Sequence, residues 1–183
     1  VVTGNMIQNV LDGVVLVNGY AGFGANLMYP SGTSLHHNRI VNNTNGLTWA
    51  NTAATLTVEN NWWGCNEGPG STGCDTLAGG GLIDEKPWLV MNVSAPPDPL
   101  IPGSTFTFTA DLTDNSDGVD TTTLGYLPNG ILIGFTPIDK VNPDSAALAS
   151  GVASTQASLP FAAGAPETFK SVDYRSRDLP GMK

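Results

Sequence analysis

Basic residues are scarce in this chain of 183 residues, which has 7 lysines and arginines against 16 acidic residues and a formal net charge of −9. A surface of that sign repels phosphate backbones and anionic lipid headgroups, so we expect no nucleic acid partner. The sequence also lacks any run of about 18 apolar residues, which predicts no membrane insertion. These absences leave proteins, sugars and neutral surfaces as the partner classes to consider.

Groups able to do chemistry are equally few. The only histidines, His36 and His37, are adjacent, and neighbours on a strand point to opposite faces, so they do not act as a pair. No zinc signature and no nucleophile elbow occurs. The aligned carboxylates of glycoside hydrolysis are not visible either. We therefore expect no cofactor and do not favour an enzyme.

The two cysteines, Cys65 and Cys74, bound a short loop rich in glycine. Such a loop predicts a disulfide, and disulfides persist in oxidising compartments. The alternative is a pair of free buried thiols. The disulfide interpretation predicts an extracellular or cell-surface location.

Glycine and proline are plentiful, with 22 and 13 residues, which is typical of turn-rich all-β proteins. A short motif recurs around Asn5, Asn38 and Asn61, at intervals of 33 and 23 residues, and the shorter interval is a solenoid period. The extra length of the first interval predicts a loop from Gly19 to Thr33. A chance run of asparagine-rich hairpins is the alternative.

Stacking the motifs in register predicts which side chains share a position. The three asparagines would form a ladder at one corner, where asparagine tolerates left-handed backbone angles and its amide bonds to the next rung. In the same register His36 lies beside Glu59, either as an aid to proton transfer or as a surface pair of little energetic value; these two are the weak catalytic candidates. The apolar residues expected to point inward together are Val2, Leu35 and Val58, and likewise Ile7, Ile40 and Trp63.

The pattern changes after residue 92. Residues 93–99 form a proline-rich linker, and Thr105–Leu112 then alternates polar and apolar residues as a half-buried strand does. Asp117-Gly118 and Asn129-Gly130 are turn dipeptides, and short strands with frequent turns favour a sandwich over residues 100–165. The tail, residues 166–183, loses this periodicity and is predicted to be irregular, which leaves the sandwich incomplete.

Residues 1–92 resemble the C-terminal rungs of pectate-lyase-like parallel β-helices in large secreted bacterial proteins. The residues that carry the resemblance are Asn60-Asn61-Trp62-Trp63-Gly64-Cys65, Gly68-Pro69 and Pro87-Trp88-Leu89. The resemblance implies that bulky aromatics plug the end of the coil, with Trp63 and Trp88 inside. The following segment resembles the bacterial immunoglobulin-like modules of surface proteins. The fold expected is therefore all-β, a right-handed parallel β-helix of few coils followed by an immunoglobulin-like β-sandwich.

Two further groups of residues are weak ligand candidates. Tyr20, Phe23 and Tyr29 lie in the predicted loop, where aromatic rings can stack on a sugar. Carboxylates cluster in a second loop and could hold calcium, although an ordinary solvated turn is the favoured interpretation and the ligand spacing differs from that of a helix-flanked calcium loop. The carboxylates concerned are those of Asp114, Asp117 and Asp120.

These observations favour a non-catalytic structural, adhesive or glycan-binding fragment of a secreted bacterial surface protein. The alternative is a carbohydrate-active enzyme of the β-helix type, a polysaccharide lyase or a glycoside hydrolase. Because the sequence begins within a rung, the first rung is expected to expose a sheet edge. Either the chain self-associates through this edge, or its own predicted loop or the tail from Lys170 to Lys183 covers it. Polysaccharides and cell-surface components are the other partners expected.

Overall fold

The computed structural model describes residues 1–16, 33–52, 54–94, 103–136, 141–158 and, for the backbone alone, 170–173. Every regular element within these ranges is a β-strand, so the predicted all-β class is confirmed. The search for a helix long and apolar enough to cross a membrane found none in the same ranges. The chain divides into two compact units, one made of residues 1–90 and 114–128, the other of residues 91–113 and 129–183.

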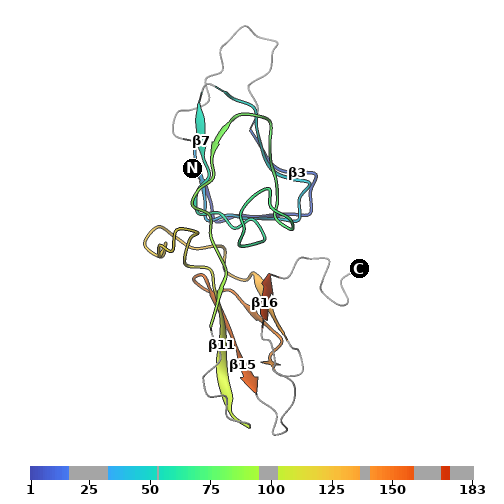
Figure 1. Ribbon diagram of the computed structural model, residues 1–183, viewed down its shortest axis with the longest axis vertical. Coiled ribbons are helices and arrows are strands. Elements are labelled where there is room, and N and C mark those ends of the chain that lie inside the picture. Colours follow the sequence, from blue (N-terminus) through green and yellow to red (C-terminus); the bar gives the residue numbers. More distant parts are fainter. Residues whose placement is uncertain (17–32, 53, 95–102, 137–140, 159–169, 174–183) are drawn as a thin grey trace. The chain divides into compact units, whose positions relative to one another are not determined.

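The first unit is built from strands that pair in parallel between successive turns of the chain. The strand pairs form three sides of each turn, and Figure 1 labels one strand of the first side, β7, and one strand of the third, β3. Each side is one set of strands from successive turns of the chain. The first side contains β1 (Val2–Thr3), β4 (Leu35–His36), β7 (Thr55–Thr57) and β9 (Leu82–Asp84). The second contains β2 (Met6–Gln8), β5 (Arg39–Val41) and the bridged residue Trp62, and the third contains β3 (Asp12–Leu16), β6 (Asn45–Trp49) and β8 (Leu77–Ala78).

The predicted register between turns is confirmed. Val2 pairs with Leu35, and Ile7 pairs with Ile40, in parallel strands. The parallel bridge between Arg39 and Trp62 brings Trp63 to the position of Ile40 in the next turn. The inward side chains form one apolar core, whose buried members are Leu35, Ile40, Leu47, Trp49, Leu56, Val58 and Trp63. Apolar burial between turns is therefore what holds this unit together.

The corner geometry differs from the prediction in one respect. The left-handed backbone angles fall one residue before each ladder asparagine, at Gly4, His37 and Asn60, with φ of 68°, 53° and 54°. The ladder asparagines are absent from the positive-φ residues, so the prediction that they adopt this conformation is wrong. The reason is a division of roles. The residue at the bend turns the chain, and the next residue can then direct its amide along the stack.

The stack continues beyond Trp63, because β8 and β9 pair in parallel with β6 and β7. Trp63 therefore lies inside the stack, as predicted, but does not plug its end. Trp88 is only partly buried against the core, so its predicted interior position is correct only in part. Residues 114–128 complete this end of the first unit: Leu89 forms an antiparallel bridge with Asn115.

The second unit has two antiparallel sheets. One has the strand order β10 (Asn92–Val93), β11 (Thr105–Asp111), β15 (Val152–Ser158) and β13 (Val141–Asn142). The other has the order β14 (Ser145–Ala147), β12 (Leu132–Thr136) and β16 (Lys170–Asp173). Strand β11 alternates in burial, as its sequence predicts. Phe108 of β11 and Phe135 of β12 meet edge to face, with ring centroids 5.5 Å apart, and join the two sheets.

Three sequence-based expectations need correction in this region. Asp117-Gly118 forms a turn, but it belongs to the first unit and does not connect strands of the second. Val93, expected in the linker, lies in β10. The tail is not irregular throughout, because β16 pairs antiparallel with β12. Non-local pairing supplies the hydrogen bonds of these segments, which local sequence patterns do not encode.

Candidate functional site

The polar feature that runs through the first unit is a ladder of asparagines on one corner. Asn5 donates from its main-chain N–H and from Nδ2 to Oδ1 of Asn38, over 3.1 and 3.0 Å. Asn38 donates in the same two ways to Oδ1 of Asn61, over 2.9 Å each. Asn38 and Asn61 are fully buried. The predicted ladder is confirmed.

Each buried ladder amide also satisfies main-chain carbonyls within its corner. Nδ2 of Asn61 donates to the carbonyl oxygens of Leu35 and Val58, and Nδ2 of Asn38 to those of Val2 and His36. A buried polar group is costly unless it is paired, and here the side chain of one residue pairs several groups at once. The ladder therefore stabilises the bend itself as well as the stacking of turns.

A second polar contact between turns was missed by the sequence analysis. Asn43 donates to the carboxylate of Asp75 from its main-chain N–H, over 3.0 Å, and from Nδ2, over 2.6 Å. Asn43 in turn accepts a hydrogen bond from the N–H of Val10 in the preceding turn. Asp75 is buried. The signal in the sequence was asparagine at positions 9, 42 and 43. The repeat is hard to recognise because the next turn has an aspartate, Asp75, in place of an asparagine.

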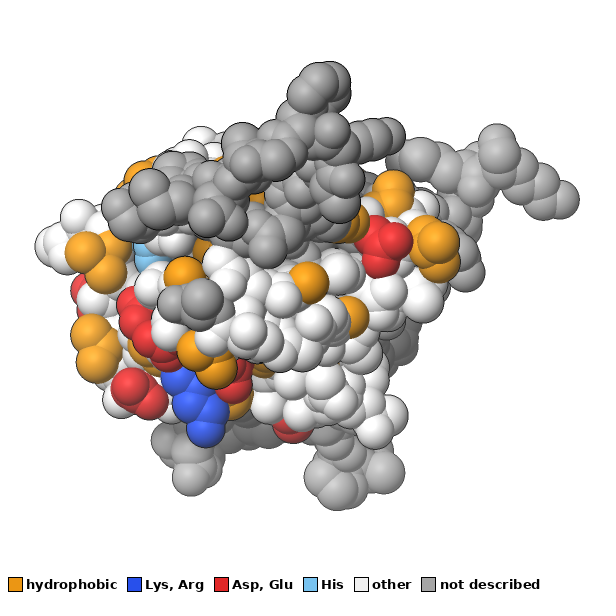
Figure 2. Space-filling model, turned by 90° about the horizontal axis from the view of Figure 1, so that it is seen from above, with side chains coloured by type: hydrophobic (Ala, Val, Ile, Leu, Met, Phe, Trp, Pro, Cys, Tyr) orange, Lys and Arg blue, Asp and Glu red, His pale blue; other side chains and the backbone are white. Residues whose placement is uncertain are grey.

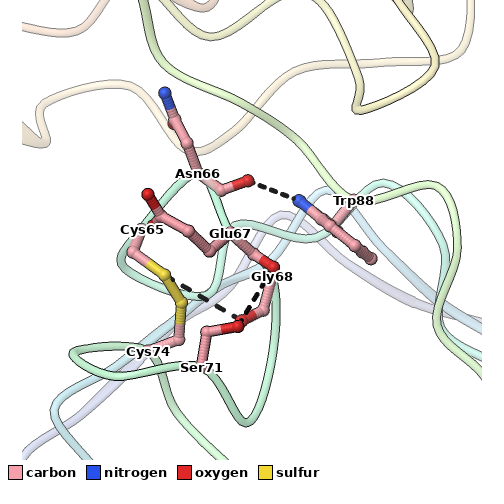
Figure 3. The surroundings of a disulfide bond; sticks show 7 residues. All are labelled: Cys65, Asn66, Glu67, Gly68, Ser71, Cys74 and Trp88. Carbon is pink, nitrogen blue, oxygen red and sulfur yellow. Dashed lines mark hydrogen bonds between the residues drawn. A yellow bond between two sulfur atoms is a disulfide. The ribbon is translucent and has the colours of Figure 1, made fainter.

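The disulfide between Cys65 and Cys74 is present, as predicted, and Figure 3 displays its surroundings. Its loop packs beneath Trp88, whose Nε1 donates to the carbonyl of Asn66 over 2.9 Å. A Cβ atom on Gly68 would lie 2.5–2.7 Å from ring atoms of Trp88, and Gly68 has a φ of +87°, so only glycine fits there. Both cysteine sulfurs are in the bond, which removes them as ligands from the cluster that they form with Glu67.

The weak catalytic candidates do not meet as expected. Nδ1 of His36 contacts the main-chain oxygen of Glu59 at 3.1 Å, so this hydrogen bond uses the peptide and not the carboxylate. His36 and Glu59 are both partly buried. This contact links adjacent turns, as the asparagine ladder beside it does. It does not arrange a histidine–carboxylate pair for proton transfer.

His37 is the unusual titratable group of this corner. Its side chain is 3 % exposed, and its Nε2 has no hydrogen-bond partner among the described residues. Gly125 lies against the ring, since a Cβ atom there would be 3.3 Å from Nδ1. Burial, and then the charge of His36, lower the pKa of His37 below its usual 6.5. Burial therefore favours the neutral form of His37, which packs against Gly125.

The carboxylates proposed for calcium are used differently. Among the described residues, Asp114, Asp117 and Asp120 do not form a group of three close ligand atoms. Asp120 accepts a hydrogen bond from the N–H of Thr122 at 2.7 Å, and hydrogen bonds from Thr122 lower the pKa of this exposed carboxyl. Asn115 organises the turn by accepting from the N–H groups of Asp117 and Val119. These contacts are those of a solvated turn.

The aromatic sugar candidates Tyr20, Phe23 and Tyr29 lie outside the described residues. On the face drawn in Figure 2, acidic, basic and hydrophobic side chains are interspersed, and no patch of one kind dominates it. Comparisons with protein-family models, with curated proteins and with solved structures found no match.

Proposed function

We propose that this chain is a non-catalytic structural and adhesive module of a secreted surface protein, built as a short right-handed parallel β-helix followed by an immunoglobulin-like sandwich. Parallel pairing in turns that are offset by 33 and 23 residues supports the first part of the proposal. Two antiparallel sheets that share Phe108 and Phe135 in their core support the second. A stack of turns suits a spacer because each turn packs on its neighbours along one direction.

One observation carries the proposal: three polar groups of the first unit that could do chemistry, one histidine, one carboxylate and one guanidinium, are engaged in structural contacts between turns. His36 bonds to the carbonyl of Glu59, Asp75 accepts from Asn43, and Arg39 donates to Gln8. Arg39 is 2 % exposed and Asp75 is 3 % exposed, so neither offers its charge to a solvent-borne substrate. A catalytic acid or base needs to reach the proton that it transfers, and these groups are already committed to the fold.

The disulfide supports a location outside the cytosol, because such bonds persist where the medium is oxidising. Adhesion to a glycan is the binding activity that we propose for the module, with the aromatic residues of the segment from Gly19 to Thr33 as the contact. Aromatic rings bind sugars by stacking, which suits a protein with few charged groups.

Two measurements on the same preparation test this function. A glycan array should give saturable binding that is weakened by Tyr20→Ala or Phe23→Ala, whereas reducing-end release from pectin, alginate and cellulose should stay at the level of the buffer. Val119→Ala, an exposed site that is not part of that segment of the sequence, is the matched control for binding. Turnover that disappears in both His36→Ala and Glu59→Gln would replace the proposal with a carbohydrate-active enzyme.

A further inference from the structure

Residues 114–128, which we call the clamp, lie between β11 and β12 in the sequence but belong to the first unit. The beginning of the clamp pairs with the turn that contains β9. The N–H of Val90 donates to the oxygen of Asp114 over 3.0 Å, and the N–H of Ser116 donates to the oxygen of Trp88 over 2.7 Å. The clamp therefore covers the main-chain edge of that turn.

The clamp also contacts the bend residues of the two preceding turns. Nδ2 of Asn115 donates to Oδ1 of Asn60 over 3.2 Å, and both residues are buried. At the equivalent bend one turn earlier stands His37, whose ring packs against Gly125 of the clamp. The N–H of His37 donates to the oxygen of Asn60 over 2.8 Å, so the two bends are themselves joined. The clamp thus holds three successive turns together at one corner.

The two bend contacts differ in chemistry. The contact with Asn60 is a hydrogen bond between neutral amides, whereas the contact with His37 is packing against a titratable ring. Nε2 of His37 is buried and has no hydrogen-bond partner among the described residues. A protonated imidazole carries two N–H donors and a charge, and burial of such a group without acceptors is costly. The neutral form of His37 is therefore the one that fits under the closed clamp.

The charged groups on the surrounding elements do not compensate for a proton on this ring. They are His36 and Arg39 on the same turn, Glu59 on the next turn, and Asp114, Asp117 and Asp120 in the clamp. None of these carboxylates accepts a hydrogen bond from Nε2 of His37. Burial is the larger cause that lowers the pKa of His37, and the charge of His36 acts in the same direction.

We propose that protonation of His37 releases the clamp from this corner and uncovers the edge from Trp88 to Val90. The ring is attached to a bend that is fixed by the hydrogen bond to Asn60, so the clamp is the part that moves. Once the clamp has left, the oxygen of Trp88 and the N–H of Val90 lose the partners that they have in the closed form. An unpaired sheet edge of this kind is able to pair with another strand. The fold therefore contains an edge that is exposed by acid.

The clamp is able to leave as one piece because its turns have their own hydrogen bonds. Oδ1 of Asn115 accepts from the N–H groups of two residues in the following turn, Asp117 and Val119. The oxygen of Thr121 accepts from the N–H groups of Leu124 and Gly125. These hydrogen bonds do not involve the stacked turns, so release of the clamp leaves them in place.

The pH range follows from the two protonation states. After release, His37 has the usual pKa of about 6.5, whereas in the closed form its pKa is lower. The open form therefore binds the proton more tightly. Its population relative to the closed form should rise about tenfold for each pH unit below about 6.5, until the pH reaches the lowered pKa.

Hydrogen exchange followed by NMR on the full chain tests the release, with protection factors that correct for the direct effect of pH on exchange. The N–H groups of Val90 and Ser116 should lose about tenfold in protection for each pH unit below about 6.5. Ile40, whose N–H donates to the oxygen of Trp62 within the stack, should be better protected at every pH. Low concentrations of urea should accelerate exchange at Ile40 but not at Ser116, because release exposes far less surface than unfolding does.

Two variants assign the effect to one histidine. His37→Asn gives this bend the residue that the next bend already has, so the fold should be kept while the pH dependence at Ser116 disappears. His36→Gln is the matched control. It should keep the pH dependence, which should level off at a higher pH because the charge of His36 no longer opposes protonation of His37.

Three results would overturn the proposal. The first is constant protection of Ser116 between pH 7 and pH 5, which would mean that the clamp stays closed. The second is an unchanged pH dependence in His37→Asn, which would assign the effect to another group. The third is an equal protection factor and an equal urea response at Ser116 and Ile40, because the clamp would then open only when the whole unit unfolds. None of these results bears on sugar binding or turnover, so this inference is tested separately from the proposed function.

Discussion

Replacing Asn38 with alanine should destabilise the first unit by about 2–4 kcal/mol, because the change removes a fully buried group that makes several hydrogen bonds. Its Oδ1 accepts two hydrogen bonds from Asn5, and its Nδ2 donates to three oxygens, at 2.9–3.1 Å. Each buried polar group left without a partner costs about 1–3 kcal/mol. The carbonyl of Val2 and the groups of Asn5 are near solvent and contribute little. Most of the loss comes from the carbonyl of His36, which loses the side-chain donor, and from Oδ1 of Asn61, which loses one of its two donors and keeps the main-chain N–H of residue 38.

Tryptophan fluorescence during urea unfolding measures the change in the free energy of unfolding of the first unit. All four tryptophans, at positions 49, 62, 63 and 88, belong to the first unit, so the signal reports that unit alone. Asn5→Ala is the matched control, since Asn5 is an exposed member of the same ladder and its loss should cost about 1 kcal/mol or less. If Asn38→Ala shifted the free energy of unfolding no more than Asn5→Ala does, the ladder would not be what stabilises the corner.

Three further changes probe other parts of the first unit. Ile40→Ala should cost about 2–5 kcal/mol in the same urea assay, because Ile40 is fully buried in the core; a loss below about 1 kcal/mol would mean that the turns do not pack as described. Reducing the Cys65–Cys74 disulfide should cost about 2–3 kcal/mol on the loop-entropy model, and the Cys65→Ala, Cys74→Ala double variant should show the same stability with and without reductant. Because the pKa of His37 is lowered in the folded protein, its unfolded form binds the proton more readily, so stability should be intact above about pH 6.5 and fall as the pH decreases below it. His37→Asn, which tolerates the left-handed bend, should remove that dependence, and an unchanged pH profile would show that His37 is not its source.

The sequence was sufficient to predict the repeated turns because the same residue types occupy equivalent positions in each of them. Asn5, Asn38 and Asn61 recur since one amide satisfies both the corner and the neighbouring turn. The inward positions recur because the core accepts only apolar side chains there, and the loop between Cys65 and Cys74 is recognisable from its glycines. Each of these features depends on the residue type at a given position, so it can be recognised in the sequence itself.

What the sequence did not predict depends on contacts between distant segments. The turn formed by β8 and β9 has no asparagine at the ladder position, where Trp88 stands instead. Residues 114–128 join the first unit through pairing with residues 88–90, although the turn at Asp117-Gly118 suggested part of the sandwich. Asp75 is buried because it accepts hydrogen bonds from Asn43, which lies one turn away. Without knowledge of that contact, an aspartate is expected to be an exposed surface charge.

The most direct test of the account is the exchange rate of the ladder side-chain amides, followed by NMR after transfer into deuterated water. The Nδ2 hydrogens of Asn38 and Asn61 are buried and hydrogen-bonded between turns, so they should remain for a time comparable with that of the core amides. Those of Asn5, which is exposed, should exchange within the first measurement. Rapid exchange at all three asparagines would contradict the stacked ladder and, with it, the structural role that we assign to the polar groups of this unit.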